Sequence, residues 1–120
     1  MGKRTLVLGA SAHSYRYSFL AIEKLLANGH EVVALGGKPG WVGQVQIYTS
    51  PANWGAIDTV TIYLSPLHQK GYYQYLQILK PNRVIFNPGA ENGELRVLLE
   101  KEGIITLNAC TLVLLSTGQY

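Results

Sequence analysis

Short apolar runs alternate along the chain with longer stretches in which apolar residues recur every three to four positions. The runs are rich in β-branched residues and are bounded by Gly, Pro, Asn or Ser, which is typical of strands buried on both faces of a sheet. They predict strands over residues 5–8, 31–35, 59–64, 83–86 and 104–107, with residues 45–48 as a candidate short edge strand.

The longer periodic stretches predict helices over residues 14–28, 68–79 and 93–102. Asn92 is the predicted cap of the third helix, and Gly29 suits the end of the first. Residues 36–43 hold four glycines and a proline and are predicted to be a loop, and no helix of useful length fits between Gly36 and Asp58. The apolar residues 111–115 are compatible with either a closing helical turn or a strand.

Strand, helix and strand in succession predict parallel strands joined by right-handed crossovers. The expected fold class is therefore α/β: a single-domain, Rossmann-like, doubly wound parallel sheet of five strands plus the short edge strand, over residues 1–120. A chain of 120 residues is long enough for one real core. A hydrophobic fraction of 48% with only 14% charged residues excludes disorder and fits a sheet covered on both faces.

Charge and cysteine content narrow the class of partner. The net charge is +3, but the ten basic residues are scattered, so we expect no nucleic-acid partner. No apolar run approaches the ~20 residues that span a membrane, so we expect no membrane partner. Asp58 is the only aspartate, which leaves little for a carboxylate metal cluster. The single cysteine, Cys110, excludes an internal disulfide framework and fits a cytoplasmic location.

The first predicted strand runs into a loop of small residues and then into a helix. Gly9, Ser11 and Ser14 occupy the first, third and sixth positions of the G-x-G-x-x-G spacing of dinucleotide loops. Such a loop lets a ligand approach bare backbone, and the following helix start favours an anion. Ser14 is the predicted N-cap. The alternative is an ordinary strand-to-helix turn that binds nothing.

The ends of the predicted strands should meet along one rim, where open α/β sheets bind ligands. An NAD site needs an acidic residue after the second strand, but this chain has Gly36, Gly37 and Lys38. The cation favours a ribose that carries a phosphate, as in NADP and coenzyme A, unless Lys38 is only a solvated loop residue. Arg16 opposes the helix dipole unless an anion lies near it or its side chain points away.

An ordered series of short motifs resembles the family of small stand-alone CoA-binding domains, relatives of the CoA-binding domain of the succinyl-CoA synthetase alpha subunit. The similarity covers essentially the whole chain. The motifs are Leu-Val-Leu-Gly-Ala-Ser at 6–11 with Ser14 and Arg16-Tyr17, Leu-Leu-Ala-Asn-Gly-His-Glu-Val at 25–32, the glycine-and-lysine loop, Ile-Asp-Thr-Val at 57–60, Asn-Pro-Gly-Ala-Glu-Asn at 87–92, Glu-Gly-Ile at 102–104 and Cys-Thr at 110–111.

The resemblance implies which residues contact coenzyme A. The pyrophosphate would lie on the loop after the first predicted strand, and the adenosine with its 3′-phosphate would lie near the loop after the second. The pantetheine arm would run along the loops that follow the strands at 59–64 and 83–86. In that order, the implied contacts are Gly9, Ala10, Ser11, Ser14 and Arg16; Gly36 and Lys38; and Ser65, Pro66, Pro88 and Gly89. Many relatives have an Asn-Pro pair directly after the second strand, where this chain has Gly36-Gly37.

The expected function is non-catalytic binding of coenzyme A or an acyl-CoA, because the phosphohistidine loop and the nucleotide-using domain of the full synthetase have no counterpart in this sequence. The alternatives are an NADP-binding reductase-type protein, a subunit of an acyl-CoA enzyme whose chemistry lies on another chain, and an interaction module with a vestigial pocket. No catalytic or metal-binding residues are predicted. A homodimer, through the edge strand at 45–48, or an enzyme partner chain stays open.

Overall fold

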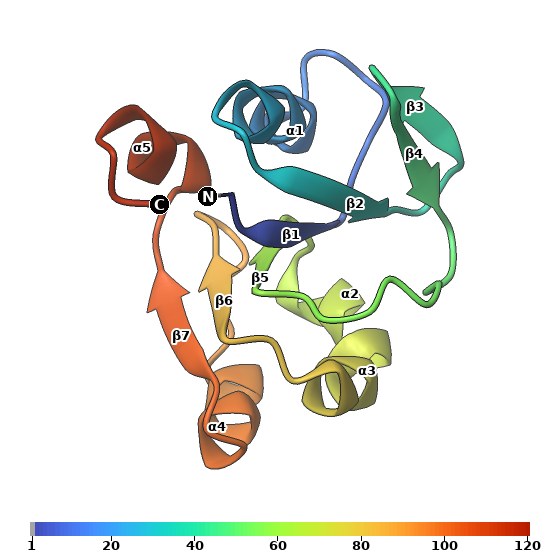
Figure 1. Ribbon diagram of the computed structural model, residues 1–120. Helices are drawn as coiled ribbons and strands as arrows, with labels where there is room; N and C mark the ends of the chain where they lie inside the picture. Colours follow the sequence, from blue (N-terminus) through green and yellow to red (C-terminus); the bar gives the residue numbers. More distant parts are fainter. Residues whose placement is uncertain (1) are drawn as a thin grey trace.

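The computed structural model describes residues 2–120. Its strands form one sheet with helices on both faces (Figure 1). The strands are β1 Arg4–Leu8, β2 Glu31–Leu35, β3 Gly40–Val42, β4 Val45–Tyr48, β5 Thr59–Ile62, β6 Arg83–Phe86 and β7 Ile105–Asn108. The helices are α1 Tyr17–Ala27, α2 Pro66–Gln69, the 3₁₀ turn η1 Lys70–Tyr72, α3 Tyr73–Leu79, α4 Gly93–Lys101 and α5 Thr111–Ser116.

The strand order β3-β4-β2-β1-β5-β6-β7 confirms the predicted α/β, Rossmann-like class. Every neighbouring pair is parallel except β3 with β4. From β1 the chain first adds β2 and β4 on one side, and it then returns to place β5 on the other side. Ligands of such sheets bind where the order reverses, which here is at the carboxyl ends of β1 and β5.

The sheet has seven strands within residues 2–120, where five and a short edge strand were predicted. The expectation that residues 45–48 form an edge is wrong, because β3 covers β4 in an antiparallel hairpin. The hairpin turns at Gly43, whose φ of 58° suits the mirror-image turns of tight hairpins. The crossover between β2 and β5 contains no helix, as predicted.

Helix boundaries also differ from the prediction. The first helix begins at Tyr17 rather than Ser14, because the backbone N–H of Arg16 donates to the carbonyl of His13 (3.0 Å) in a preceding turn. The predicted helix over 68–79 begins earlier, at Pro66, and is divided by η1, which contains Gly71. The cap at Asn92 is confirmed: its Oδ1 accepts from the N–H of Leu95 (3.1 Å). Residues 111–115 are helical.

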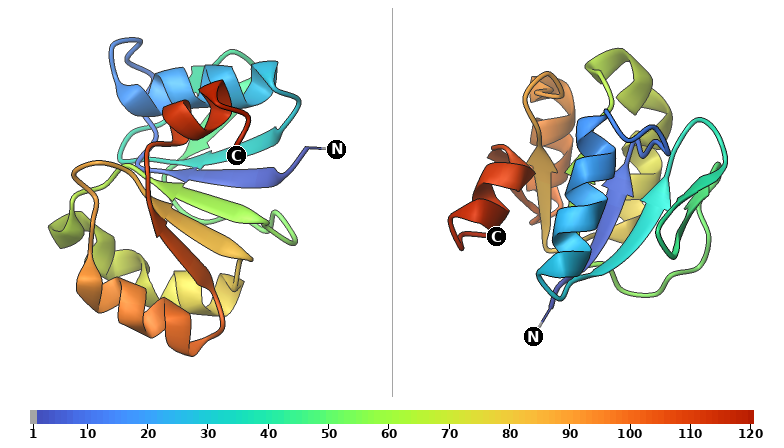
Figure 2. Two further views of the ribbon diagram at one scale, coloured as in Figure 1. Left: turned by 90° about the vertical axis from the view of Figure 1, so that its left-hand side faces the viewer. Right: turned by 90° about the horizontal axis from the view of Figure 1, so that it is seen from above.

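Two apolar layers enclose the sheet (Figure 2). Helices α2, α3 and α4 cover one face, over a core that includes Leu6, Ile62 and Phe86. Helices α1 and α5 cover the other face, over Val7 and Ala34. Because alternate residues of a strand point to opposite faces, the central strands must be apolar on both sides, which explains their unbroken apolar runs. Within residues 2–120, no helix has the length and apolar character to cross a bilayer.

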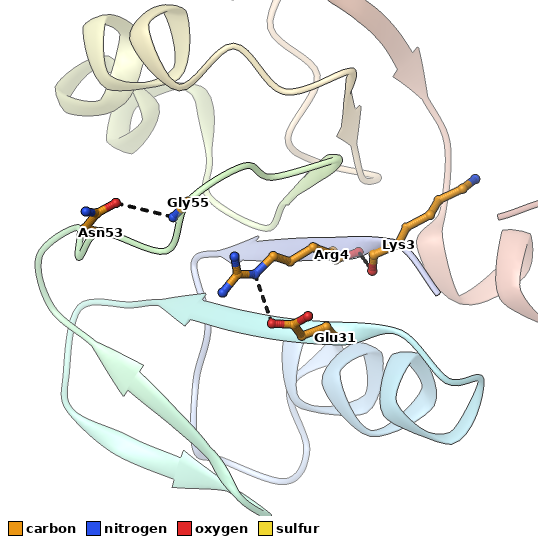
Figure 3. Close-up of polar contacts among 6 residues, drawn as sticks. Lys3, Arg4, Glu31, Asn53 and Gly55 are labelled. Atoms are coloured by element: carbon orange, nitrogen blue, oxygen red, sulfur yellow. Dashed lines mark hydrogen bonds and ion pairs between the residues drawn. The ribbon is translucent and has the colours of Figure 1, made fainter. Parts of the chain in front are cut away.

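Arg4 and Glu31 pair across the first two strands at the end of the sheet where these strands begin (Figure 3). Arg4 Nε lies 3.0 Å from Glu31 Oε2, and the two side chains are 34% and 67% exposed. Such an exposed pair stabilises a fold by at most about 1 kcal/mol. In the loop that follows β4, Asn53 Oδ1 accepts from the N–H of Gly55 (3.4 Å). Burial in the apolar layers, rather than the Arg4–Glu31 ion pair, therefore stabilises the pairing of β1 with β2.

Candidate functional site

A cleft of about 820 Å³ opens at the carboxyl ends of β1 and β5, where the strand order reverses. Five segments line it: residues 9–13, 16–18, 37–39, 63–65 and 88–90. They follow β1, β2, β5 and β6 or begin α1, so four separate loops converge on one place. The volume lies in the range of small-molecule sites.

The first residues of the loop after β1 are hydrogen-bonded to the end of β2. The N–H groups of Gly9 and Ala10 both donate to the carbonyl of Leu35, at 2.9 and 2.8 Å. Gly9 has a φ of 93°, and a Cβ there would lie 3.0 Å from the backbone of Tyr63 and from the side chain of Leu64. A glycine is therefore required where β1 passes beside the end of β5.

The next amides of this loop are free. The N–H groups of Ser11 and Ala12 form no hydrogen bond within residues 2–120, and both residues line the cleft. Ser11 Oγ instead accepts from the N–H of His13 (3.1 Å), which holds the turn. The loop thus carries two unpaired backbone donors among the residues that line the cleft, and such donors can bind an anion.

Eight of the eleven predicted site residues line the cleft, and three do not. Those that do are Gly9, Ala10, Ser11, Arg16, Lys38, Ser65, Pro88 and Gly89. Ser14, Gly36 and Pro66 lie outside the lining. Ser14 is also not the N-cap of α1: Arg16 holds that position, without a side-chain hydrogen bond. The prediction of that cap is therefore wrong, and the extra turn before the helix is the cause.

Gly36 does not line the cleft but packs against the lining residue Ala10. It is buried, and a Cβ there would lie only 2.2 Å from the carbonyl oxygen of Ala10. Its N–H donates to the carbonyl of Tyr48 (2.9 Å) on β4. The exposed Gly37, which was not among the predicted contacts, lines the cleft beside Lys38.

The charged side chains that line the cleft are cationic. Arg16 and Lys38 line it, and no Asp or Glu belongs to the lining within residues 2–120. Arg16 also lies 5.7 Å from the ring of Tyr15, which stacks on His13 at 5.4 Å between ring centres. One carboxylate lies at the edge of the cleft, where Glu91 Oε1 accepts from the N–H of Gly89 (2.8 Å). Two cations in the lining, together with the free amides of Ser11 and Ala12, still favour a ligand with at least two anionic groups.

Sequence reasoning missed the side chain that joins two walls of the cleft. Gln69 is fully buried, and its Nε2 donates to the carbonyls of Leu64 (2.8 Å) and Ala90 (2.7 Å). Its Oε1 accepts from Asn92 Nδ2 (2.9 Å). One amide thus ties the loop after β5 to the loop after β6. No sequence signal marks it, because a glutamine in a polar helical stretch is usually exposed.

Asn87 plays the matching role beneath Pro88 and Gly89. It is 2% exposed, and its Nδ2 donates to Thr61 Oγ1 (2.7 Å) and to the carbonyl of Ile62 (2.9 Å). Its Oδ1 accepts from the N–H of Thr111 (2.9 Å), the first residue of α5. The turn after β6 is therefore fixed to β5 and to the last helix.

Three further groups near the cleft carry reactive chemistry. Ser65 Oγ lies 2.8 Å from His68 Nδ1. Burial raises the pKa of Tyr63 to about 12, so its hydroxyl stays protonated at neutral pH. Cys110, the only cysteine, is partly exposed at the N-cap of α5 and does not line the cleft. Residues 2–120 contain no group of three or more His, Cys, Asp or Glu side chains that could hold a metal ion.

Known proteins resemble this chain in sequence and in fold. The family model described as a CoA binding domain matches residues 3–116. A solved structure of an uncharacterized protein is 44% identical, with a TM-score of 0.97, over 100% of this chain and 99% of that one.

More distant structures share the fold. A hypothetical protein from Pyrococcus horikoshii OT3 is 22% identical, with a TM-score of 0.84, over 93% of this chain and 80% of that one. Acetyl-coenzyme A synthetase 1 of Ca. Korarchaeum cryptofilum is 14% identical, with a TM-score of 0.73, over 89% of this chain and 26% of that one. No curated protein matches the sequence. Since the family model spans nearly the whole chain, this protein belongs to the CoA binding domain family.

Proposed function

We propose that this chain binds coenzyme A, or an acyl-CoA, in the cleft at the carboxyl ends of β1 and β5. The observation that carries the proposal is the lining itself, which combines free amides at Ser11 and Ala12 with the cations Arg16 and Lys38 and contains no Asp or Glu among the described residues. Coenzyme A carries a pyrophosphate and a ribose 3′-phosphate, so it has two anionic groups that these two cations could bind.

The proposed arrangement follows the order of the loops around the cleft. The pyrophosphate lies on the Gly9–Ala10–Ser11 turn beside Arg16, where the start of α1 adds a favourable partial charge. Lys38 meets the 3′-phosphate. The pantetheine arm passes toward Ser65 and the Pro88–Gly89 turn. Gly36 contributes by allowing Ala10 to pack closely, and Ser14 and Pro66 lie beyond the direct contacts.

NADP is the competing ligand, because a 2′-phosphate would satisfy Lys38 equally well. The family match favours coenzyme A over NADP. We also propose that residues 1–120 act as one unit in the cytoplasm, where a single free cysteine stays reduced.

A thermal-shift comparison of coenzyme A, dephospho-CoA, NADP and NAD tests the proposal. A ligand at about 100 times its Kd adds about 2.7 kcal/mol, which raises the Tm of a domain this size by on the order of 10 °C. We expect a shift with coenzyme A that shrinks with dephospho-CoA and in Lys38→Ala. The matched control is Lys101→Ala, which removes an exposed lysine from α4, outside the cleft.

A larger shift with NADP than with coenzyme A would favour the reductase-type alternative. The absence of a shift with all four ligands would contradict nucleotide binding and leave only the fold. An equal shift with coenzyme A and dephospho-CoA would remove Lys38 from the site while leaving the pyrophosphate contacts in place.

A further inference from the structure

Ser65 and His68 form a hydrogen-bonded pair at the wall of the cleft that follows β5. Ser65 Oγ and His68 Nδ1 are 2.8 Å apart, within the range of a nucleophile and its general base. Ser65 lines the cleft, and both residues are exposed. A ligand in the cleft and the surrounding water can therefore both reach the pair.

The Ser65 hydroxyl does not cap helix α2, although a serine at the N-cap position usually does. Ser65 is the N-cap residue of α2, yet its side chain makes no hydrogen bond to a helix amide. Its hydroxyl pairs with the His68 ring instead. When the ring carries its proton on Nε2, Nδ1 is an acceptor and the Ser65 hydroxyl donates to it.

We propose that Ser65 and His68 are a nucleophile and general base that cleave the thioester of an acyl-CoA bound in the cleft. This inference rests on the proposed function, because the arm of coenzyme A must run from the Gly9 loop toward Ser65 to bring the thioester to the pair. It goes beyond that function, since it assigns a reaction to a chain whose sequence predicts binding alone.

The reaction balances with water as the only co-substrate. Ser65 Oγ attacks the thioester carbonyl, and the hydroxyl proton passes to His68 Nδ1. The C–S bond then breaks, and the leaving thiolate takes that proton to give coenzyme A, which leaves an ester on Ser65. Water attacks this ester while His68 accepts a proton from it. The proton then returns to Ser65 Oγ as the carboxylic acid departs.

Turnover should be slow compared with a full catalytic triad. Within residues 2–120, no carboxylate contacts His68, so no group fixes the tautomer of its ring. Loss of the aspartate's function in a serine protease triad lowers kcat by about 10⁴-fold. Because an oxygen ester is a poorer acyl donor than a thioester, hydrolysis should be the slower step, and the acyl-serine intermediate should accumulate enough to be detected.

The experiment incubates the full chain with acetyl-CoA and with a longer acyl-CoA and follows release of coenzyme A by chromatography. Chromatography is needed because Cys110 would also react with thiol-detecting reagents. Peptide mass spectrometry then locates the acyl group. We expect acylation at Ser65, and a fall in coenzyme A release of about 10²-fold or more in Ser65→Ala and in His68→Gln.

Control variants separate chemistry from folding and binding. Ser65→Ala should keep the wild-type Tm in the absence of ligand, because the hydroxyl caps no helix amide. Ser65→Cys should restore acyl transfer through a thiol nucleophile. Ser50→Ala, an exposed serine outside the cleft, should behave as wild type.

Intact acyl-CoA after incubation with wild-type protein that still shows a thermal shift would overturn the reaction and leave coenzyme A binding standing. Unchanged cleavage in Ser65→Ala or His68→Gln would overturn the assignment of the pair. Absence of both cleavage and thermal shift would overturn this inference together with the proposed function.

Discussion

The guanidinium of Arg83 lies 4.3 Å from the centre of the Tyr120 ring, and its Nη2 donates to the Tyr120 carbonyl (2.9 Å). The ring is held on other sides too. Its hydroxyl lies 2.6 Å from Thr5 Oγ1, and His30 packs against it edge-on at 4.8 Å between ring centres. Tyr120 thus packs against the first residues of β1 and β6 and does not line the cleft.

Tyr120→Ala should therefore lower the free energy of unfolding by about 2–4 kcal/mol, since it removes a mostly buried ring. Tyr120→Phe should cost only about 1 kcal/mol, because it loses the hydroxyl bond alone. Urea unfolding gives both values. Tyr15→Ala is the control, since Tyr15 is 73% exposed. Equal stability of Tyr120→Ala and wild type would show that the contacts of this ring contribute nothing.

Gly36 and Gly37 form a matched pair for testing how the cleft is supported. Gly36→Ala should destabilise the protein by about 2–3 kcal/mol, because its Cβ would meet the Ala10 carbonyl oxygen at 2.2 Å. A Cβ at Gly37 has no neighbour within 4 Å, so Gly37→Ala should change stability by less than about 0.5 kcal/mol. The Tm values of the two variants measure the difference. A similar Tm for both would contradict the close packing of Gly36 on Ala10.

Asn87→Ala should cost about 3 kcal/mol, because it leaves buried partners on β5 and α5 without their hydrogen bonds. It should also loosen the Pro88–Gly89 turn and so weaken coenzyme A binding. Asn108→Ala removes an exposed amide from β7 and serves as the control. Guanidinium unfolding and the ligand-induced thermal shift report the two effects separately. Wild-type stability in Asn87→Ala would show that the buried network is energetically neutral.

His30 should make stability fall in mild acid. Burial, with Lys3 as the next cause, lowers the pKa of His30, whose Nδ1 accepts from the N–H of Lys3 (2.9 Å). The unfolded chain therefore binds this proton more readily than the folded one. The stabilising contribution is complete above the ordinary pKa of about 6.5 and is lost as the pH falls toward the lowered value.

Urea unfolding at several pH values between about 7.5 and 5 tests this, and His30→Gln should flatten the dependence. His13→Gln, at an exposed histidine, should not. Asp58 acts in a separate window. Burial raises the pKa of this carboxyl, but hydrogen bonds from Thr59 and Asn82 outweigh burial and lower it, so its contribution is lost only below about pH 4. If the free energy of unfolding of His30→Gln still falls between about pH 7.5 and 5, a group other than His30 causes the pH dependence.

Tyr63 should make stability fall at alkaline pH, in contrast to His30, which acts at acidic pH. Burial raises its pKa to about 12, so its contribution is complete below the ordinary value of about 10 and is lost as the pH rises toward 12. Tyr63→Phe should reduce the loss of stability above pH ~10. The hydroxyls of Thr61 and Thr111 lie near the phenol without forming a hydrogen bond to it, so this variant should cost little at neutral pH.

Melting curves at neutral pH and near pH 11 measure the effect, with Tyr17→Phe as the exposed control. A parallel alkaline loss in wild type and Tyr63→Phe would mean that Tyr120 or Tyr75, whose pKa values burial also raises, dominates instead.

The sequence by itself determined the elements that depend on local pattern. Unbroken β-branched runs and helical periodicity placed the five central strands and the helix stretches, because both periods are properties of neighbouring residues. Since parallel strands end on one side of a sheet, it also located the loops that meet around the cleft. The Asn92 cap was predictable for the same reason, as its partner Leu95 lies three residues away.

Only the tertiary structure decided what depends on contacts between distant segments. The strand Gly40–Val42 lies in a glycine-rich loop and forms because β4 offers it a free edge. Gly36 supports the cleft through a carbonyl that precedes it by 26 residues (36 minus 10), and Gln69 joins the cleft walls through Ala90 and Asn92. No local period encodes such contacts, because each becomes favourable only after folding has removed the partners from water.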